Sequence, residues 1–339
     1  MINKKINATI IAIVFVVGSF LFNISPAFAQ QVSLSISPPL IESLIKPSRS
    51  ILIAYRVENF GDPVILSSHI RRFEPKDNRG NIAIKDNADG PIRFSLDNAD
   101  LALGQSFFLK TLDSKQILLR MRVPEGAPSG DYYYTLLLQT EPPPSVSGSS
   151  HSRAKATIGS NILITVSNTG KLEVKPKIVL FDVLSSIKIP FIGKDIRLFD
   201  SGNSIPVVLL VKNQGSNLIK PQGEILLRGN FGERASFDII PKNILSNSER
   251  YVYASPSAQI DCEVNKSKAE CKNETSLVIK GFFVGKYNLS TSVNFGEGTP
   301  TLFASISFIS LPFKFIIGVL VSVAVALVII HRLRYKTEV

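Results

Sequence analysis

The sequence predicts an all-β protein with two immunoglobulin-like β-sandwich domains in tandem, followed by a single C-terminal transmembrane helix. Three observations predict this fold class. Short segments of alternating apolar and polar residues recur along the chain, with no long amphipathic helix between them. One strand-and-turn pattern occurs in both halves of the chain. An apolar segment of about 20 residues, long enough to cross a bilayer as a helix, is followed at the C-terminal end by a basic tail.

Three well-marked strands lie in the first half. Ser50–Glu58 and Gln116–Val123 alternate with period two, which is the pattern of a half-buried strand. The residues expected to face inward are Ile51, Ile53, Tyr55, Val57, Ile117, Leu119, Met121 and Val123. The third strand, Asp131–Thr140, contains three tyrosines and three leucines. Turn residues separate these segments, as in a β-sandwich.

A short internal repeat supports two domains of the same kind. Val57–Gly61 has the sequence Val-Glu-Asn-Phe-Gly, and Val211–Gly215 has Val-Lys-Asn-Gln-Gly, each at the end of an alternating strand. Gly130-Asp-Tyr132 recurs in the same way as Gly285-Lys-Tyr287, and each opens a late strand. Because the order of strand, turn and Gly-x-Tyr strand is the same twice, we expect two related sandwiches.

The boundary between them is expected near Gly170, which gives domains of residues 30–170 and 171–310. Glu141–Ala156 contains three consecutive prolines and several serines, a composition that also suits an interdomain linker. Thr157–Ser167, however, has the pattern of a strand that the first sandwich needs as its last. We therefore expect the Pro/Ser stretch to be a long loop within domain one, with a true linker as the alternative.

Both ends of the chain carry apolar segments. Ile10–Phe22 follows two lysines and precedes Ala-Phe-Ala, which is the layout of a secretory signal peptide. Residues 1–29 are therefore expected to be removed by cleavage between Ala29 and Gln30, with an uncleaved anchor as the alternative. Residues 311–330 are expected to span the membrane rather than form a buried core helix, and the basic residues 331–339 predict a cytoplasmic C-terminus. The protein would then be a single-pass type I membrane protein with an extracellular ectodomain.

Charge and cysteine content narrow the possible partners. The net charge of +11 suits an anionic neighbour such as a cell-wall polymer or an acidic lipid surface. The alternative is a basic surface that faces solvent and has no anionic partner. No nucleic-acid-binding motif is present, so nucleic acid is not an expected partner. Cys262 and Cys271 are the only cysteines, and in an oxidising compartment they are expected to form one local disulfide. Two free thiols are the alternative.

Catalytic motifs are lacking in the sequence. His69, His151 and His331 are far apart, and no metal, phosphate-loop or nucleophile motif occurs. We therefore expect no enzyme activity, no cofactor and no metal, although scattered carboxylates leave a glycan-cleaving site open. His69, Arg71 and Arg72 form a basic strand end that is a candidate contact for an anion, with a solvated edge strand as the alternative.

Three parts of the chain carry a resemblance to a known family: Val57–Gly61, Leu119–Pro124 with Gly130-Asp-Tyr132, and Leu245–Tyr251 with Gly285-Lys-Tyr287. With this layout, the chain resembles the WxL-interacting proteins of Gram-positive bacterial surfaces. The resemblance implies a peptidoglycan-binding immunoglobulin-like domain, a second sandwich that engages surface partners, and one C-terminal helix with a short basic tail.

We therefore expect a membrane-anchored protein that holds cell-wall polymer or another surface protein near the membrane. The alternative is a membrane-tethered assembly chaperone that pairs an edge strand with secreted subunits. A cell-wall glycan ectoenzyme is the third hypothesis. A flat basic or aromatic face would favour the first, a long uncovered apolar edge strand the second, and a carboxylate pair in a cleft the third. The sequence does not indicate the oligomeric state.

Overall fold

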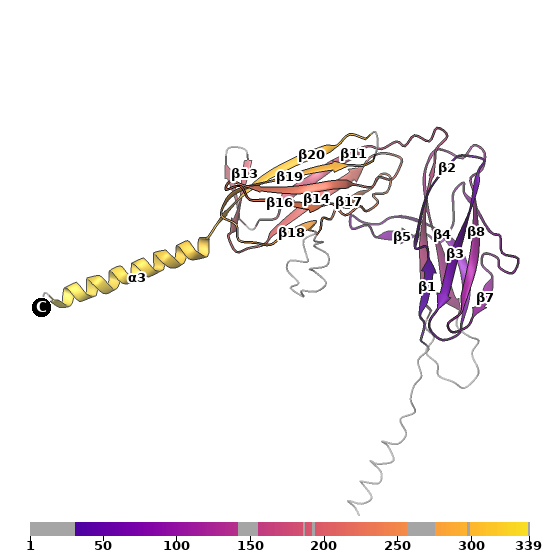
Figure 1. Ribbon diagram of the computed structural model, residues 1–339, viewed down its shortest axis with the longest axis horizontal. Helices are drawn as coiled ribbons and strands as arrows, with labels where there is room; N and C mark the ends of the chain where they lie inside the picture. Colours follow the sequence, from indigo (N-terminus) through magenta and orange to yellow (C-terminus); the bar gives the residue numbers. More distant parts are fainter. Residues whose placement is uncertain are drawn as a thin grey trace, which may run out of the picture.

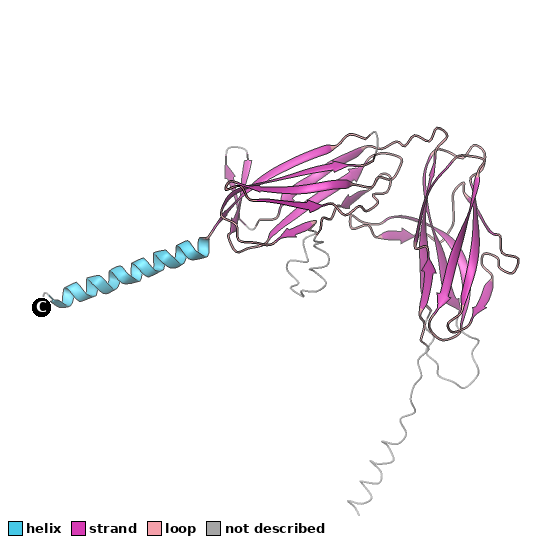
Figure 2. Ribbon diagram, in the orientation of Figure 1, coloured by secondary structure: helices cyan, strands magenta, loops and turns pink. Residues whose placement is uncertain are grey.

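A computed structural model describes residues 31–141, 155–185, 187–191, 194–255, 275–296 and 299–337. The described chain is all-β apart from one C-terminal helix, and its strands form two tandem sandwiches whose long axes meet at an elbow (Figures 1 and 2). The predicted fold class is therefore confirmed. The signal-peptide residues, the Pro/Ser stretch 142–154 and both cysteines lie outside the described residues.

Domain one consists of two antiparallel-type sheets with one parallel pair. The first sheet has the order β1-β3-β8-β6, and the second has the order β2-β10-β9-β4-β5, with β7 also pairing with β4. The strands are β1 (Leu34–Ser37), β2 (Leu40–Ile45), β3 (Ser50–Asn59), β4 (Val64–Pro75), β5 (Ile82–Ile84), β6 (Arg93–Leu96), β7 (Ser106–Leu109), β8 (Ser114–Arg122), β9 (Gly130–Glu141) and β10 (Thr157–Val166). Since β9 and β10 pair along their length, the Pro/Ser stretch joins two strands of one sheet and is not an interdomain linker.

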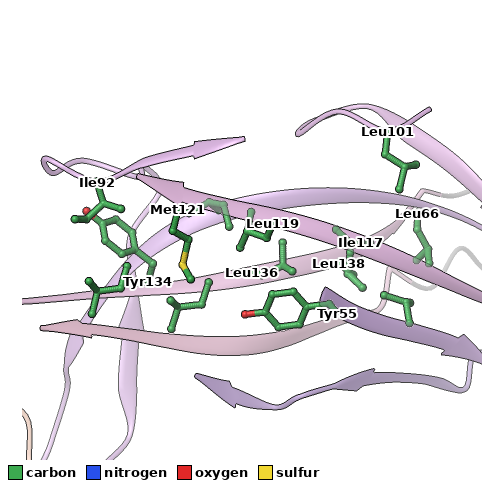
Figure 3. Packing of buried hydrophobic residues seen from close by; sticks show 14 of the residues in the cluster. Tyr55, Leu66, Ile92, Leu101, Ile117, Leu119, Met121, Tyr134, Leu136 and Leu138 are labelled. Carbon is green, nitrogen blue, oxygen red and sulfur yellow. The ribbon is translucent and has the colours of Figure 1, made fainter. Parts of the chain in front are cut away.

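The core of domain one is formed by the predicted alternation. Tyr55 and Val57 of β3 are fully buried, and Ile51 and Ile53 pack partly buried against the same cluster. All four predicted inward residues from Ile117 to Val123 are fully buried. Figure 3 shows Tyr55, Leu119, Tyr134 and Leu136 packed between the two sheets. The predictions for these strands are confirmed.

Domain two has a topology similar to that of domain one, with β12 as an additional edge strand. Its sheets have the orders β11-β14-β17, with β18 also on β14, and β12-β13-β20-β19-β15-β16. The strands are β11 (Pro176–Val183), β12 (Ile187–Phe191), β13 (Lys194–Asp200), β14 (Ile205–Asn213), β15 (Gln222–Gly229), β16 (Arg234–Asp238), β17 (Glu249–Tyr251), β18 (Leu277–Ile279), β19 (Gly285–Asn294) and β20 (Leu302–Leu311). The parallel pair β2–β10 of domain one corresponds to the parallel pair β13–β20.

The repeated Asn-x-Gly motif is the same turn in both domains. The Asn59 side-chain amide donates to the carbonyl oxygens of Asp62, Leu109 and Lys110, and its oxygen accepts from the Gly61 amide at 3.0 Å. Asn213 donates to three carbonyl oxygens of its own domain and accepts from the Gly215 amide at 2.9 Å. In each domain, one buried asparagine thus joins two loops. Each glycine is required because a Cβ at its position would overlap a neighbouring backbone.

The C-terminal helix α3 (Phe313–Thr337) follows β20 after one proline. Residues 313–330 are long and apolar enough to be a candidate membrane span. The expected start at residue 311 is wrong, because Leu311 is still paired in β20 and Pro312 precedes the first helical turn. Burial acts to raise the pKa of Asp200 beside this turn, but hydrogen bonds from Lys314 and its charge outweigh burial and lower the pKa.

Candidate interaction surfaces

The two domains meet through a small apolar cluster of their own. Phe73, Tyr133 and Leu163 lie on the outer face of the β2-containing sheet and bury Leu245 of domain two, with the Phe73 and Tyr133 rings stacked at 5.7 Å. These residues alternate with core residues on their strands, so the sheet is apolar on both faces at this place. The elbow is therefore a packed junction and not a flexible tether.

Asp131 is the polar centre of this junction. One carboxylate oxygen accepts from Thr165 Oγ1 at 2.7 Å and from Asn217 Nδ2 at 2.9 Å, and the other accepts from Tyr133 Oη at 2.8 Å and from the Leu218 amide at 2.5 Å. Two of these donors belong to each domain. The carboxylate consequently bonds both sandwiches at once, and such charge-assisted hydrogen bonds are the strong ones.

The β4–β5 hairpin reaches across the elbow as a second contact. The Tyr251 amide donates to the Asn78 carbonyl at 2.8 Å, and Asn78 Nδ2 donates to Glu249 at 3.1 Å. The Arg250 guanidinium lies directly on Gly80, where a Cβ would overlap it. Between the hairpin, β2, β10 and domain two lies a cavity of about 340 Å³, with Leu40 at its wall.

The outer edge of β2 lies beside this cavity and is unpaired among the described residues. Asn161 donates to the Pro39 carbonyl and Ser167 to the Ile45 carbonyl, so the odd-numbered residues of β2 bond β10. The backbone groups of Leu40, Glu42 and Leu44 therefore point away from the sheet. Both leucines are exposed, and Glu42 accepts hydrogen bonds from Lys220 and Asn243 of domain two.

Domain two shows what such an edge can accept. The strand that corresponds to β2 is β13, as the register around the repeated glycine shows. In domain one, Val166 lies opposite Gly130 and also pairs with Ile45 of β2. In domain two, Ser310 lies opposite Gly285 and also pairs with Phe199 of β13. The outer edge of β13 is covered from Lys194 to Leu198 by β12, an antiparallel strand of the chain itself, and residues 194–198 are those that correspond to the β2 edge. Within the described residues, the repeated fold thus has this edge paired in one copy and open in the other.

A second surface is the outer face of the β1-β3-β8-β6 sheet. Arg93 of β6 lies directly opposite Arg122 of β8, and both are exposed. Like charges in direct cross-strand register destabilise a sheet, so this pair is unfavourable in the free protein. The neighbouring Arg56 and Arg120 are instead paired with Glu58 and Asp97. The face therefore carries exposed positive charge at Arg93 and Arg122.

The predicted anion contact is only partly brought together. His69 and Arg71 lie on the outer face of their sheet, whereas Arg72, the next residue of β4, projects from the opposite face. His69 contacts Ser67 Oγ at 3.1 Å, and Arg72 lies 4.0 Å from Glu74. Whether these residues bind an anion stays a prediction. The Ala29–Gln30 cleavage site and the Cys262–Cys271 pair lie outside the described residues.

The described residues contain no group of three or more His, Cys, Asp or Glu side chains arranged to hold a metal. The surfaces that stand out were missed by the sequence analysis for two different reasons. The β2 edge has only six residues between turns, and no sequence pattern shows whether an edge is covered. The Arg93–Arg122 pair depends on the register between strands that are far apart in the chain. Asp131 stood out in the sequence only as the middle residue of the first Gly-x-Tyr motif.

No family model and no curated protein matches this chain. Among solved structures it is similar to the class 5 fimbriae chaperone CfaA, at 12% identity and a TM-score of 0.35, over 82% of this chain and 100% of that chain. It is similar to the E. coli chaperone DraB at 12% identity and a TM-score of 0.34, over 82% and 98% of the two chains. A Pseudomonas aeruginosa CupB2 chaperone matches at 12% identity and a TM-score of 0.31, over 80% and 100%. At TM-scores this low, neither the function nor the partners of those proteins transfer to this chain.

Proposed function

We propose that this protein is a non-enzymatic, membrane-anchored binding protein that holds an extended segment of another polypeptide along the outer edge of β2. The observation that carries the proposal is the difference between the two copies of the fold: β12 covers the edge of β13, and the described chain leaves the edge of β2 open. Main-chain hydrogen bonds would supply affinity, and alternate side chains would supply specificity.

The surroundings of β2 suit a partner strand of alternating apolar and polar residues. Leu40 and Leu44 are exposed on one face, and Leu40 also lines the elbow cavity, which can take an apolar side chain. Solvent-exposed edges with apolar residues are a hazard that natural proteins usually cover. This role is that of the assembly chaperone expected as the alternative from the sequence. We also propose that the ectodomain lies outside the cell and that α3 anchors it.

The test uses the full chain in nanodiscs and an array of alternating apolar and polar octapeptides. A binding peptide should slow amide exchange at Leu40, Glu42 and Leu44. Leu44→Pro removes one outward donor without touching the β2–β10 ladder and should abolish binding, whereas Leu44→Ala, which keeps the donor, should retain most of it. Binding unaffected by Leu44→Pro, protection elsewhere, or no binding by any peptide would overturn the proposal.

A second candidate function, binding of an anionic cell-wall polymer, is favoured by the exposed arginines Arg93 and Arg122 and agrees with the resemblance to WxL-interacting proteins. The full chain should then sediment with purified cell walls, less so as salt rises. Arg122→Gln should weaken sedimentation more than Arg56→Gln, because Arg56 is already neutralised by Glu58 at 2.8 Å. Equal effects of the two substitutions would exclude this face as the binding surface.

A further inference from the structure

One end of domain two combines several turns with the start of α3. We call the turns 201–204, 230–233 and 280–284 the foot. Strand register places them together: Gly229 pairs with Tyr287, and Gly285 pairs with Ser310, one residue before the end of β20. Figure 1 shows α3 leaving this end of domain two, opposite the elbow with domain one.

Direct hydrogen bonds connect the foot to the helix. The Phe283 amide donates to the Ser201 carbonyl at 3.0 Å, and the Ser201 amide donates to the Leu311 carbonyl at 3.1 Å. The Lys314 amide in the first turn of α3 donates to Asp200 at 3.4 Å. The position of the foot is therefore fixed relative to the residue at which the apolar helix begins.

The foot exposes large apolar side chains. Phe231 is 78% exposed and Phe282 is 73% exposed, and Val284 is also exposed. These residues come from two turns that the fold brings to the same end, since a Cβ at Gly285 would lie 3.4 Å from the Phe231 ring. Phenylalanine is one of the side chains with which protein segments at a membrane surface enter the boundary between headgroups and acyl chains.

The exposed rings are held by a rigid base. Behind Phe282, the buried rings of Phe283, Tyr287 and Phe308 pack against one another with centroids 5.4 to 6.4 Å apart. The Phe231 turn is closed by a hydrogen bond from its amide to Glu233 at 3.0 Å, and Tyr287 donates to the same carboxylate at 3.0 Å. The foot therefore presents its apolar side chains in a fixed arrangement.

We propose that the foot is a lipid-binding surface, with Phe231 and Phe282 inserted into the headgroup region of the bilayer that α3 crosses. The bilayer is the occupant because the foot is continuous with the first turn of the apolar helix and cannot leave the membrane surface while α3 spans it. Lys286 is exposed near the same end and suits anionic headgroups, whereas Lys314 is paired with Asp200 at 3.4 Å. The proposal depends on α3 being a membrane span and is independent of any partner at β2.

The chain contains no tryptophan, so a single introduced tryptophan reports one position. Phe231→Trp and Phe282→Trp would be prepared in the full chain and reconstituted into liposomes with and without brominated lipids. Phe303→Trp is the matched control: Phe303 is 76% exposed on the same domain, but it lies in the first half of β20, away from α3. Val284→Trp replaces Phe282→Trp if that variant does not fold.

Brominated lipids are expected to remove most of the emission from tryptophan at 231 and 282 and to leave the emission at 303 nearly unchanged. Emission should also shift to shorter wavelength when detergent is replaced by bilayer. Equal quenching at all three positions would overturn the proposal. A third outcome would also overturn the proposal: emission that is already at short wavelength in detergent and is not quenched by brominated lipids in liposomes. It would show that protein, such as a second copy of the chain, covers the foot.

Discussion

Replacement of Asp131 by asparagine should loosen the elbow without unfolding either sandwich. The substitution keeps the shape of the side chain but turns one of its two acceptor oxygens into a donor. Each oxygen of Asp131 accepts two hydrogen bonds, one of them from domain two. The new NH₂ group therefore faces Asn217 Nδ2 in one orientation of the amide and the Leu218 amide in the other, so one donor of domain two always loses its acceptor.

The size of the effect follows from these contacts. A donor deprived of a charged partner costs about 1–3 kcal/mol, and the loss of charge weakens the remaining bonds as well. Asn217 is buried and Leu218 partly buried, so water replaces the lost acceptor incompletely. We expect the free energy of elbow opening to fall by about 2–4 kcal/mol, which corresponds to a roughly 30- to 700-fold larger equilibrium constant for opening by the tenfold-per-1.4 kcal/mol rule.

Amide hydrogen exchange on the full chain measures this opening. The Tyr251 amide bonds the Asn78 carbonyl across the elbow, remote in sequence from Asp131, and its exchange should accelerate in Asp131→Asn. Amides in the β19–β20 ladder should keep their protection because domain two stays folded. Glu58→Gln, which removes an exposed surface ion pair, is the control and should change little. Unchanged exchange at Tyr251 in Asp131→Asn would refute the view that this carboxylate holds the elbow.

Three further results are expected. Asn59→Ala and Asn213→Ala should each destabilise their own domain by about 3–5 kcal/mol, because each removes three hydrogen bonds to buried or partly buried carbonyl oxygens and takes the side-chain acceptor from one glycine amide. Domain-resolved exchange is the measurement, and unequal losses would contradict the equivalence of the two turns. Burial and the charge of Asp131 raise the pKa of Tyr133 above its value in the unfolded chain. The contribution of the Tyr133 hydroxyl to stability should therefore be complete below about pH 10 and decrease above it. In urea titrations, Tyr133→Phe should reduce this loss of stability at alkaline pH. Cys262 and Cys271 should form a disulfide, and mass mapping of non-reduced peptides should show them linked; two alkylatable thiols in the exported protein would contradict this.

Sequence periodicity was a sound guide wherever one face of a strand meets a core. Ile117 to Val123 of β8 alternates strictly and is buried as expected, since one face of the strand packs and the other is solvated. The alternation pattern fails as a guide at places where the outer face of a strand also packs against protein. Nothing in the sequences of β9 and β10 distinguishes Tyr133 and Leu163 from core residues, yet both side chains pack at the elbow. Contact between the domains depends on how the two folded sandwiches are arranged, which the pattern within one strand does not indicate. The helix start was misplaced by two residues because Leu311 is apolar in both roles, as a strand end and as membrane-spanning sequence.

The elbow and the direct passage from β20 into α3 also have a mechanical consequence. Domain one joins domain two before β11, and the apolar helix α3 leaves after β20 (Figure 1). If the protein acts as proposed, tension between a partner held at β2 and a bilayer crossed by α3 pulls on domain two from opposite ends. The terminal strand β20 pairs with β19 over nine residues and with β13 over three. Tension along β20 loads all of these hydrogen bonds together in shear, because ladder bonds lie across the strand direction, and it does not open them one after another. With the proposed anchorage and partner, domain two would be a force-bearing link, and its loaded strand β20 has ten residues and spans about 34 Å at 3.4 Å per residue.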